Sequence, residues 1–185
     1  VLNATGASDL FLGRATAEEK KQHEVKIVLG DKGMISDRPI TISVQEALTP
    51  QLRSQIAQAI KHYPEATVRL TLGGVTPPSE RKSIQGFKVF LNKPDATAAT
   101  PVDDPHYARS IEFAPTNDAP QAFAFDILRT LVALKKFEQF DILDPEKPFK
   151  VTIVPNPAPG VSRLPDEASF SVHTLALEVP EPKKH

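Results

Sequence analysis

The chain has no cysteine and no tryptophan, and it carries only two tyrosines among 185 residues. Without cysteine, neither a disulfide framework nor metal ligation by thiolates is possible. No apolar run approaches the roughly 20 residues that span a bilayer. The amino terminus also lacks a basic region followed by an apolar core, which is the pattern of a secretory signal. We therefore expect no membrane span.

Positive and negative charges are nearly balanced, with 22 basic and 23 acidic residues. The basic residues do not gather into a stripe interleaved with aromatics, the pattern of a nucleic-acid groove. We expect no nucleic-acid partner. Because the first residue is Val1 rather than methionine, we also expect a piece of a longer protein, although an artificial boundary would look the same.

The sequence is rich in two residue types, with 18 prolines and 10 phenylalanines. This composition is typical of many short strands separated by rigid turns rather than of a helical bundle. The length suits one domain of ordinary size with a well-filled core. We predict an N-terminal arm or linker at residues 1–23, a single β-sandwich domain at 24–179 and a charged tail at 180–185.

Alternation of apolar and polar residues, interrupted by glycine, proline, asparagine or aspartate, predicts the strands. The predicted strands are residues 24–29, 40–44, 66–72, 86–92, 110–113, 122–125, 149–154 and 170–179. We expect Pro155 to end the strand at 149–154, because proline cannot donate a hydrogen bond to a neighbouring strand. Strands at this spacing, without regular helix crossovers, favour an antiparallel β-sandwich or jelly-roll with one or two short helices inserted.

The sequence period becomes helical between residues 49 and 63. Thr49 suits the N-cap, Pro50 suits the first helical position, and Pro64 ends the segment. The expected apolar face consists of Leu52, Ile56, Ala59, Ile60 and Tyr63. A second, shorter helix is predicted after Asp126, which can cap a run of apolar residues that reaches Leu134.

The five histidines show no spacing typical of a metal site, since none has another histidine three to five residues away. The nearest approach to a metal or acid/base cluster is Asp103, Asp104 and His106. A simpler interpretation is a proline-bounded turn in which the aspartates accept hydrogen bonds from local backbone N–H groups. His173 is expected to be an ordinary residue of the last strand. No Gly-x-Ser-x-Gly nucleophile elbow and no phosphate loop occur, so no catalytic set is visible.

Five short stretches stand in a recognisable order. They are GFKVFLN at 86–92, DDPHYARSIEF at 103–113, FAFDILRTL at 123–131, VTIVP at 151–155 and LALEV at 175–179. In this order they resemble the carboxy-terminal domain of plant-type polyphenol oxidases, the tyrosinase and catechol oxidase group. The first stretch is similar to that family's Lys-Phe-Asp-Val strand, with Gly86 at the place of the lysine and Lys88 at that of the aspartate. The helix predicted at 49–63 is not part of the plant pattern, which points to a bacterial or otherwise diverged member.

The resemblance implies a domain without catalysis of its own. In this family the histidines that bind the dinuclear copper lie in a central helical domain, so the copper would belong to a catalytic domain of the same precursor. The domain would cover that copper site, keep the enzyme latent, and assist its folding or copper loading. Such a shield places an apolar side chain where a phenol would bind. The candidate plug or interface residues are Leu10, Phe11, Leu12, Pro157, Pro159, Val161 and Leu164.

Two other functions stay open at this point. The chain could be a free-standing jelly-roll binding module for a carbohydrate or protein ligand. The lack of tryptophan, with only Tyr63 and Tyr107 as tyrosines, argues against stacking on sugars. It could also be a metal-dependent enzyme built around Asp103, Asp104 and His106.

Overall fold

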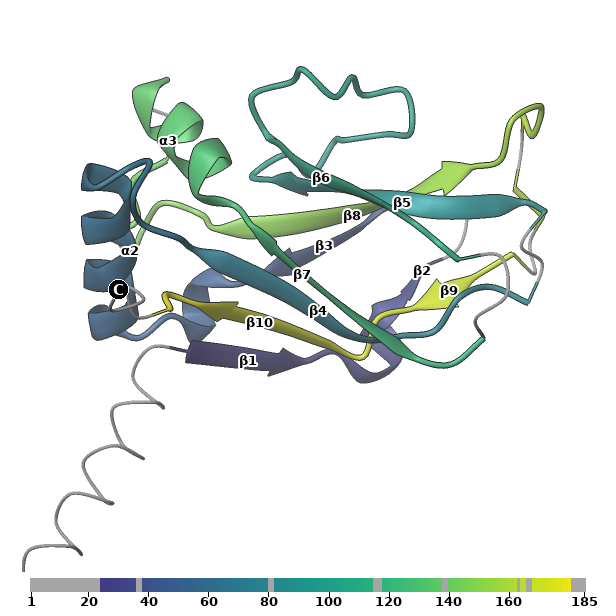
Figure 1. Ribbon diagram of the computed structural model, residues 1–185, viewed down its shortest axis with the longest axis horizontal. Coiled ribbons are helices and arrows are strands. Elements are labelled where there is room, and N and C mark those ends of the chain that lie inside the picture. Colours follow the sequence, from purple (N-terminus) through teal and green to yellow (C-terminus); the bar gives the residue numbers. More distant parts are fainter. Residues whose placement is uncertain are drawn as a thin grey trace, which may run out of the picture.

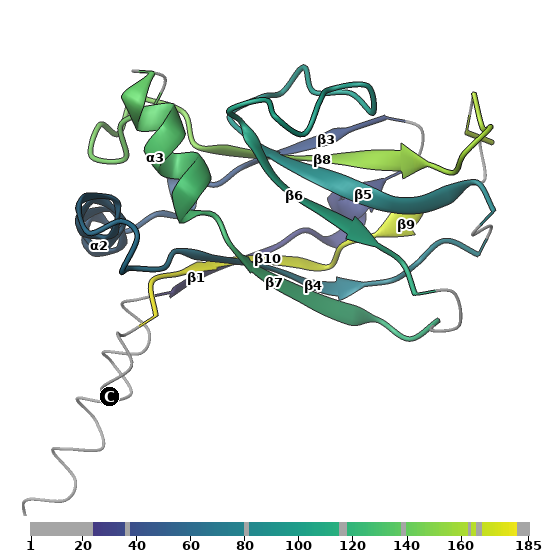
Figure 2. The same cartoon turned by 45° about the horizontal axis from the view of Figure 1, so that its top comes forward.

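The computed structural model describes residues 24–35, 38–79, 82–114, 118–137, 140–162, 164–165 and 168–180. Two four-stranded antiparallel sheets pack face to face, and the described helices lie together at one end (Figures 1 and 2). Among the described residues strand exceeds helix, at 37% against 18%, and their sheets do not close into a barrel. The predicted fold class, a mainly β sandwich with short helices inserted, is confirmed. The predicted arm at 1–23 and the end of the predicted tail, 181–185, lie outside the described residues.

The first large sheet runs from β1 (Glu24–Val28) through β10 (Thr174–Glu178) and β4 (Arg69–Val75) to β7 (Gln121–Asp126). The second runs from β3 (Ile40–Ser43) through β8 (Lys150–Pro157) and β5 (Ile84–Leu91) to β6 (Tyr107–Glu112). A small sheet pairs β2 (Met34–Ile35) with β9 (Phe170–Ser171). Short 3-10 turns, η1 (Gly30–Gly33) and η2 (Gln45–Ala47), follow β1 and β3 respectively.

Phe87 on β5 lies in the main core between the two large sheets and is fully buried. Its ring stacks on Phe170 of β9, with 5.2 Å between the ring centroids. It also meets Phe123 of β7 edge-on, at a centroid distance of 6.1 Å. Because these rings come from all three sheets, their contacts tie the sheets together, and each such pair contributes about 0.5–1.5 kcal/mol beyond simple burial.

The predicted helix after Thr49 is α2 (Pro50–Lys61). The Thr49 hydroxyl accepts a hydrogen bond of 3.1 Å from the backbone N–H of Leu52, so the predicted N-cap is confirmed. The helix buries Leu52, Ile56, Ala57, Ala59 and Ile60. The prediction was wrong for Tyr63, which lies beyond the last helical turn and is 45% exposed.

The second predicted helix is α3 (Leu128–Lys136). An Asp126 carboxylate oxygen accepts hydrogen bonds from the backbone N–H groups of Leu128, at 3.0 Å, and Val68, at 3.1 Å. The same carboxylate therefore helps to start the helix and links it to the residue before β4. This second link could not be read from the local sequence.

The single strand predicted at 170–179 is wrong, because the chain divides there into β9 and β10. His173 lies at the break and is exposed, while its backbone bonds to Leu29 and Gly73. Gly74 opposes this break with a φ of +62°, and a Cβ at Gly74 would lie 2.7 Å from the Cβ of His173. The buried residues have even numbers around β9, at Phe170 and Val172, and odd numbers in β10, at Leu175 and Leu177. This shift by one residue could have indicated the break in the sequence.

The expected end of a strand at Pro155 is also wrong, since β8 continues to Pro157. β3 pairs with β8 only up to the Ile40–Ile153 pair, so the rest of β8 has a free edge on that side. The backbone N–H of Ala158 points the other way, to Ser83 before β5. The N–H positions of successive residues in a strand point to opposite sides. Pro155 and Pro157 therefore place their missing N–H on the side opposite to that of Ala158, at the free edge, where proline is tolerated.

Candidate functional site

Residues 92–106, which we call the strap, connect β5 to β6 and lie over the outer face of the second sheet (Figure 2). Lys88 projects from β5 towards the strap. Its ammonium donates hydrogen bonds to the carbonyl oxygens of Ala98, at 2.8 Å, and Thr100, at 3.2 Å. Bonds from a charged donor are stronger than neutral ones, so Lys88 fixes the middle of the strap to the sheet.

A small apolar cluster fills the space under the strap. It consists of Phe90 on β5, Ala96 on the strap and Val154 on β8, each at most 1% exposed. Tyr107 packs against the edge of this cluster, and the centroid of its ring lies 5.8 Å from that of the Phe90 ring. This cluster is separate from the main core between the sheets. The outer face of the second sheet is thus covered by the chain itself.

Two of the three residues of the predicted cluster, Asp104 and His106, close a turn at the far end of the strap. An Asp104 carboxylate oxygen accepts a 2.9 Å hydrogen bond from the backbone N–H of His106 and lies 2.9 Å from ring Nδ1 of the same histidine. The ammonium of Lys93 lies 3.6 Å from its other oxygen. For Asp104 the simpler interpretation, a turn closed by a local backbone bond, is confirmed. Asp103 is exposed.

The electrostatics of Asp104 follow from these contacts. Partial burial raises the pKa of its carboxyl, but the hydrogen bonds from His106 and the nearby charges of Lys93 and His106 outweigh burial. The net pKa therefore lies below the ordinary value of an aspartate. A carboxylate held in its charged form by its own turn suits a structural role better than proton transfer near neutral pH.

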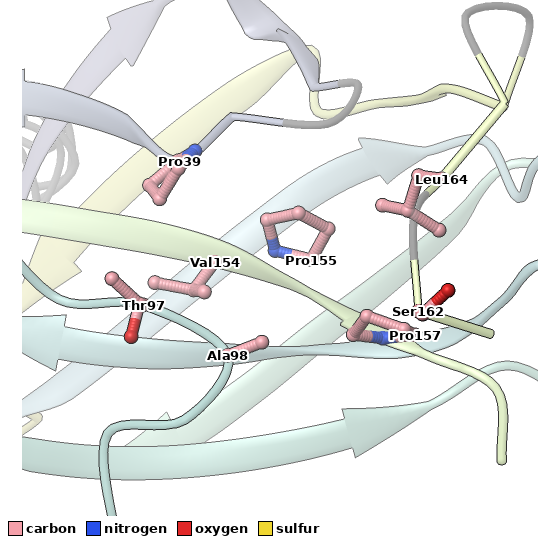
Figure 3. A pocket seen from close by; sticks show the side chains of 8 residues that line it. All are labelled: Pro39, Thr97, Ala98, Val154, Pro155, Pro157, Ser162 and Leu164. Carbon is pink, nitrogen blue, oxygen red and sulfur yellow. The ribbon is translucent and has the colours of Figure 1, made fainter. Parts of the chain in front are cut away.

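An apolar groove of about 300 Å³ lies beside the strap, at the free edge of β8 (Figure 3). It is lined by Pro39, Thr97, Ala98, Val154, Pro155, Pro157, Ser162 and Leu164. None of these side chains carries a charge, and none is aromatic. The groove lies where β3 begins only at Ile40, so no described strand pairs with the last residues of β8 on that side. Its chemistry suits an apolar group and offers no stacking platform for a sugar.

The structure brings together two of the predicted plug residues, Pro157 and Leu164, which line this groove (Figure 3). Leu164 is only 6% exposed, so it already belongs to the packing of this chain. Val161 is partly buried against the main core, while Pro159 is exposed. The other predicted residues, Leu10, Phe11 and Leu12, lie outside the part of the chain that the structure describes.

Sequence reasoning missed the role of Lys88 and most of the groove. The alternation along residues 86–92 places Lys88 on the face opposite Phe87, next to Phe90, and a lysine among apolar outward residues was the available signal. The groove walls come from four separate segments, which include Pro39, Thr97, Pro155 and Ser162. No local pattern links those segments.

No metal site is found where the structure describes the chain. Within those residues no three or more histidine, aspartate or glutamate side chains come close enough to hold a metal ion. His62 and His173 are exposed, and His106 is engaged by Asp104. The described donors therefore do not fit a dinuclear copper centre, which needs converging imidazoles. Neither described helix is long and apolar enough to cross a membrane.

The described residues thus form a β-sandwich module with an apolar groove and a strap over one sheet. Neither the known family profiles nor the curated proteins include a match to this chain. Among solved structures it is similar to recombinantly expressed latent aurone synthase (polyphenol oxidase), with 18% identity, a TM-score of 0.49, and coverage of 85% of this chain and 26% of that one.

Two related structures give similar values. The same enzyme co-crystallised with hexatungstotellurate(VI) and soaked in H2O2 has 20% identity and a TM-score of 0.47, and the match covers 87% of this chain and 29% of that one. Latent aurone synthase from natural source has 17% identity and a TM-score of 0.38, with 86% and 25% covered. The chain therefore spans about a quarter of the length of these proteins, and the likeness is distant.

Proposed function

We propose that this chain is the C-terminal domain of a polyphenol oxidase of the tyrosinase and catechol oxidase group, from a bacterial or otherwise diverged member. It has no catalysis of its own and covers the dinuclear copper site of the catalytic domain in the same precursor. Covering the site keeps the enzyme latent and assists its folding or copper loading. The parent protein is a copper-dependent oxidase.

The observation that carries this proposal is where the five family-like stretches fall. Residues 86–92 form most of β5, 103–113 end the strap and form β6, and 123–131 form the end of β7 and the start of α3. Residues 151–155 lie in β8, and residues 175–178 lie in β10 with Val179 directly after it. Apart from residues 103–106 of the strap, the stretches thus lie mainly in framework elements of the sandwich. Short matches that keep their order along the chain support common ancestry better than any one motif.

The two departures from the family's strand have physical explanations. A side chain at Gly86 would collide with the carbonyl group of Ile111 on β6, so the family's lysine has no room there. Lys88, at the place of the aspartate, makes its own contacts with the strap. Both changes are accommodated within the same strand, so they do not argue against the proposed relationship.

A covering domain must bury enough surface to hold its partner and present an apolar group to the substrate site. Stable interfaces bury about 800 Å² on each partner. Of the candidate plugs that the structure describes, Pro159 is the exposed one, and Gly160, with a φ of +83°, follows it in a turn. Proline loses little conformational entropy when it binds, which suits a residue that inserts into a pocket. The apolar Leu10–Leu12 stretch is the competing candidate.

The experiment that tests the proposal begins with the precursor's own catalytic domain, produced separately and loaded with copper. Titration calorimetry with this chain should show one-to-one association. The residues upstream of Val1 should contain two sets of three histidines on helices. A lack of association together with a precursor that has no such histidines would refute the proposal.

A further inference from the structure

The strap and the sandwich beneath it are held by different sets of contacts. Phe90, Ala96 and Val154 form their own small cluster, and none of them belongs to the main core. Of the strap residues, Ala96 is the fully buried one. The exposed ones are Pro94, Asp95, Thr97, Ala99, Pro101, Val102, Asp103 and Pro105. Losing the strap contacts would therefore leave the main core intact.

The two ends of the strap are fixed to the second sheet by backbone hydrogen bonds. Asn92 bonds through its N–H to the carbonyl of Lys150 at 2.9 Å, and its side-chain oxygen accepts from the Lys150 N–H at 2.7 Å. At the other end, the carbonyl of His106 accepts from the Leu91 N–H at 2.8 Å. Between these two points, Lys88 supplies the hydrogen bonds from β5 to the middle of the strap.

We propose that the strap is a lid that opens as a unit about Asn92 and His106, with Lys88 as its latch. Opening breaks the bonds from Lys88 to Ala98 and Thr100 and uncovers Phe90 and Val154. It also removes Thr97 and Ala98 from the wall of the groove, so the groove and the uncovered cluster become one apolar surface. Proteins open in such local units when few buried contacts hold a segment. This device does not depend on the proposed function.

The absence of cysteine from the chain allows a direct test with single-cysteine reporters. Val154→Cys places a thiol under the lid, and Val151→Cys, the same substitution three residues away on β8, places one in the main core. Both positions are at most 1% exposed. In the full chain we expect dithionitrobenzoate to modify V154C at least about 10-fold faster than V151C, because only the first thiol is reached by local opening.

Lys88→Met, which keeps the aliphatic stem and removes the charged donor, tests the latch. Modification of V154C should become about 10- to 100-fold faster, in line with the loss of hydrogen bonds from a charged group. Modification of V151C, which requires global unfolding, should stay slower than that of V154C by about the same ratio as in the chain with Lys88, which also shows that the variant is folded. Lys88→Arg should restore most of the protection, and Lys26→Met, on exposed β1, should have no effect on either thiol.

Three results would overturn the lid. The first is equal reaction rates of V154C and V151C in the chain with Lys88. The second is a modification rate of V154C that Lys88→Met leaves unchanged. The third comes from hydrogen exchange of the unsubstituted chain. The N–H groups of Ala96, Thr97 and Thr100 are bonded within short turns of the strap, which lose their packing on the sheet when the lid opens. The lid would be overturned if these groups became exposed to exchange only when the N–H groups of β4 do. The lid requires that they exchange at denaturant concentrations that leave β4 protected.

Discussion

Gly86 on β5 lies against Ile111 on β6 so closely that a side-chain carbon at position 86 would collide with the Ile111 carbonyl group. The second atom in the way, Cα of Glu112, would be 2.9 Å from it. Both obstacles are backbone atoms of the paired strand, which cannot turn aside as a flexible side chain can. The glycine is therefore required by the pairing of β5 with β6.

Gly86→Ala should lower the free energy of unfolding by about 2 kcal/mol or more, because the strands must separate to admit the methyl group. Urea denaturation followed by circular dichroism measures this change. Ala99→Ser, at an exposed position of the strap, serves as the control and should stay within about 0.5 kcal/mol of the parent chain. Equal stabilities of the two variants would contradict the close pairing.

Phe87→Ala should cost about 3–5 kcal/mol, because it removes a fully buried ring that contacts rings from the other two sheets. The matched control is Phe137→Ala, which makes the same chemical change at a site that is 57% exposed. Its effect should be below about 1 kcal/mol. Thermal or urea unfolding of both variants gives the comparison. Similar losses of unfolding free energy at the two sites would contradict the placement of Phe87 in the main core.

Asp104→Asn should reveal a pH-dependent contribution to stability. The native pKa of Asp104 is lowered, so its charged form stabilises the fold above the unfolded pKa, and this contribution is lost as pH falls through the native pKa. We expect the variant to be less stable than the parent at about pH 6, with a difference that shrinks as the pH falls below about 4, the ordinary range of aspartate.

The measurement for Asp104 is a series of urea denaturations between about pH 3 and pH 7. Asp103→Asn is the control, since Asp103 is the adjacent and exposed carboxylate. It should show a smaller difference at every pH. A gap between Asp104→Asn and the parent that widens on acidification would contradict the assigned contacts with His106 and Lys93.

The plug of the proposed shield can be identified by charge substitutions. If Pro159 enters the substrate site, Pro159→Asp should weaken binding to the copper-bearing domain at least about 10-fold, because a carboxylate would have to be buried. Pro101→Asp makes the same change at an exposed proline of the strap and should leave the dissociation constant unchanged. Phe11→Asp tests the competing stretch, and a loss there alone would assign the plug to the N-terminal residues.

Much of the framework could be predicted because its signals are local. The cap by Thr49, the apolar face of α2 and the alternation along β5 each depend on neighbouring residues. The division between β9 and β10 was missed because both faces of the segment around His173 carry apolar residues, so the run could be read as one strand. The extension of β8 to Pro157 was missed because it depends on where β3 stops.

The candidate site could be predicted only in part. Pro157 and Leu164 were chosen for their stiff, apolar surroundings, and they do line the groove. The opposite wall, from Thr97 and Ala98, depends on how the strap folds back over β5. That fold is fixed by Lys88, whose partners lie 10 and 12 residues along the chain and are backbone carbonyls. Any residue type could supply such an acceptor, so the sequence holds no sign of the partners.

The most direct test of the proposed function is the rate of phenol oxidation by the precursor's copper-loaded catalytic domain as this chain is added. We predict that the rate falls to a small residual value, with half-inhibition at a concentration that matches the dissociation constant from calorimetry. The Phe87→Ala variant, which lacks a stable core, should inhibit less. An oxidation rate that is unchanged at saturating concentrations of the folded chain would contradict the proposal that this domain covers the copper site.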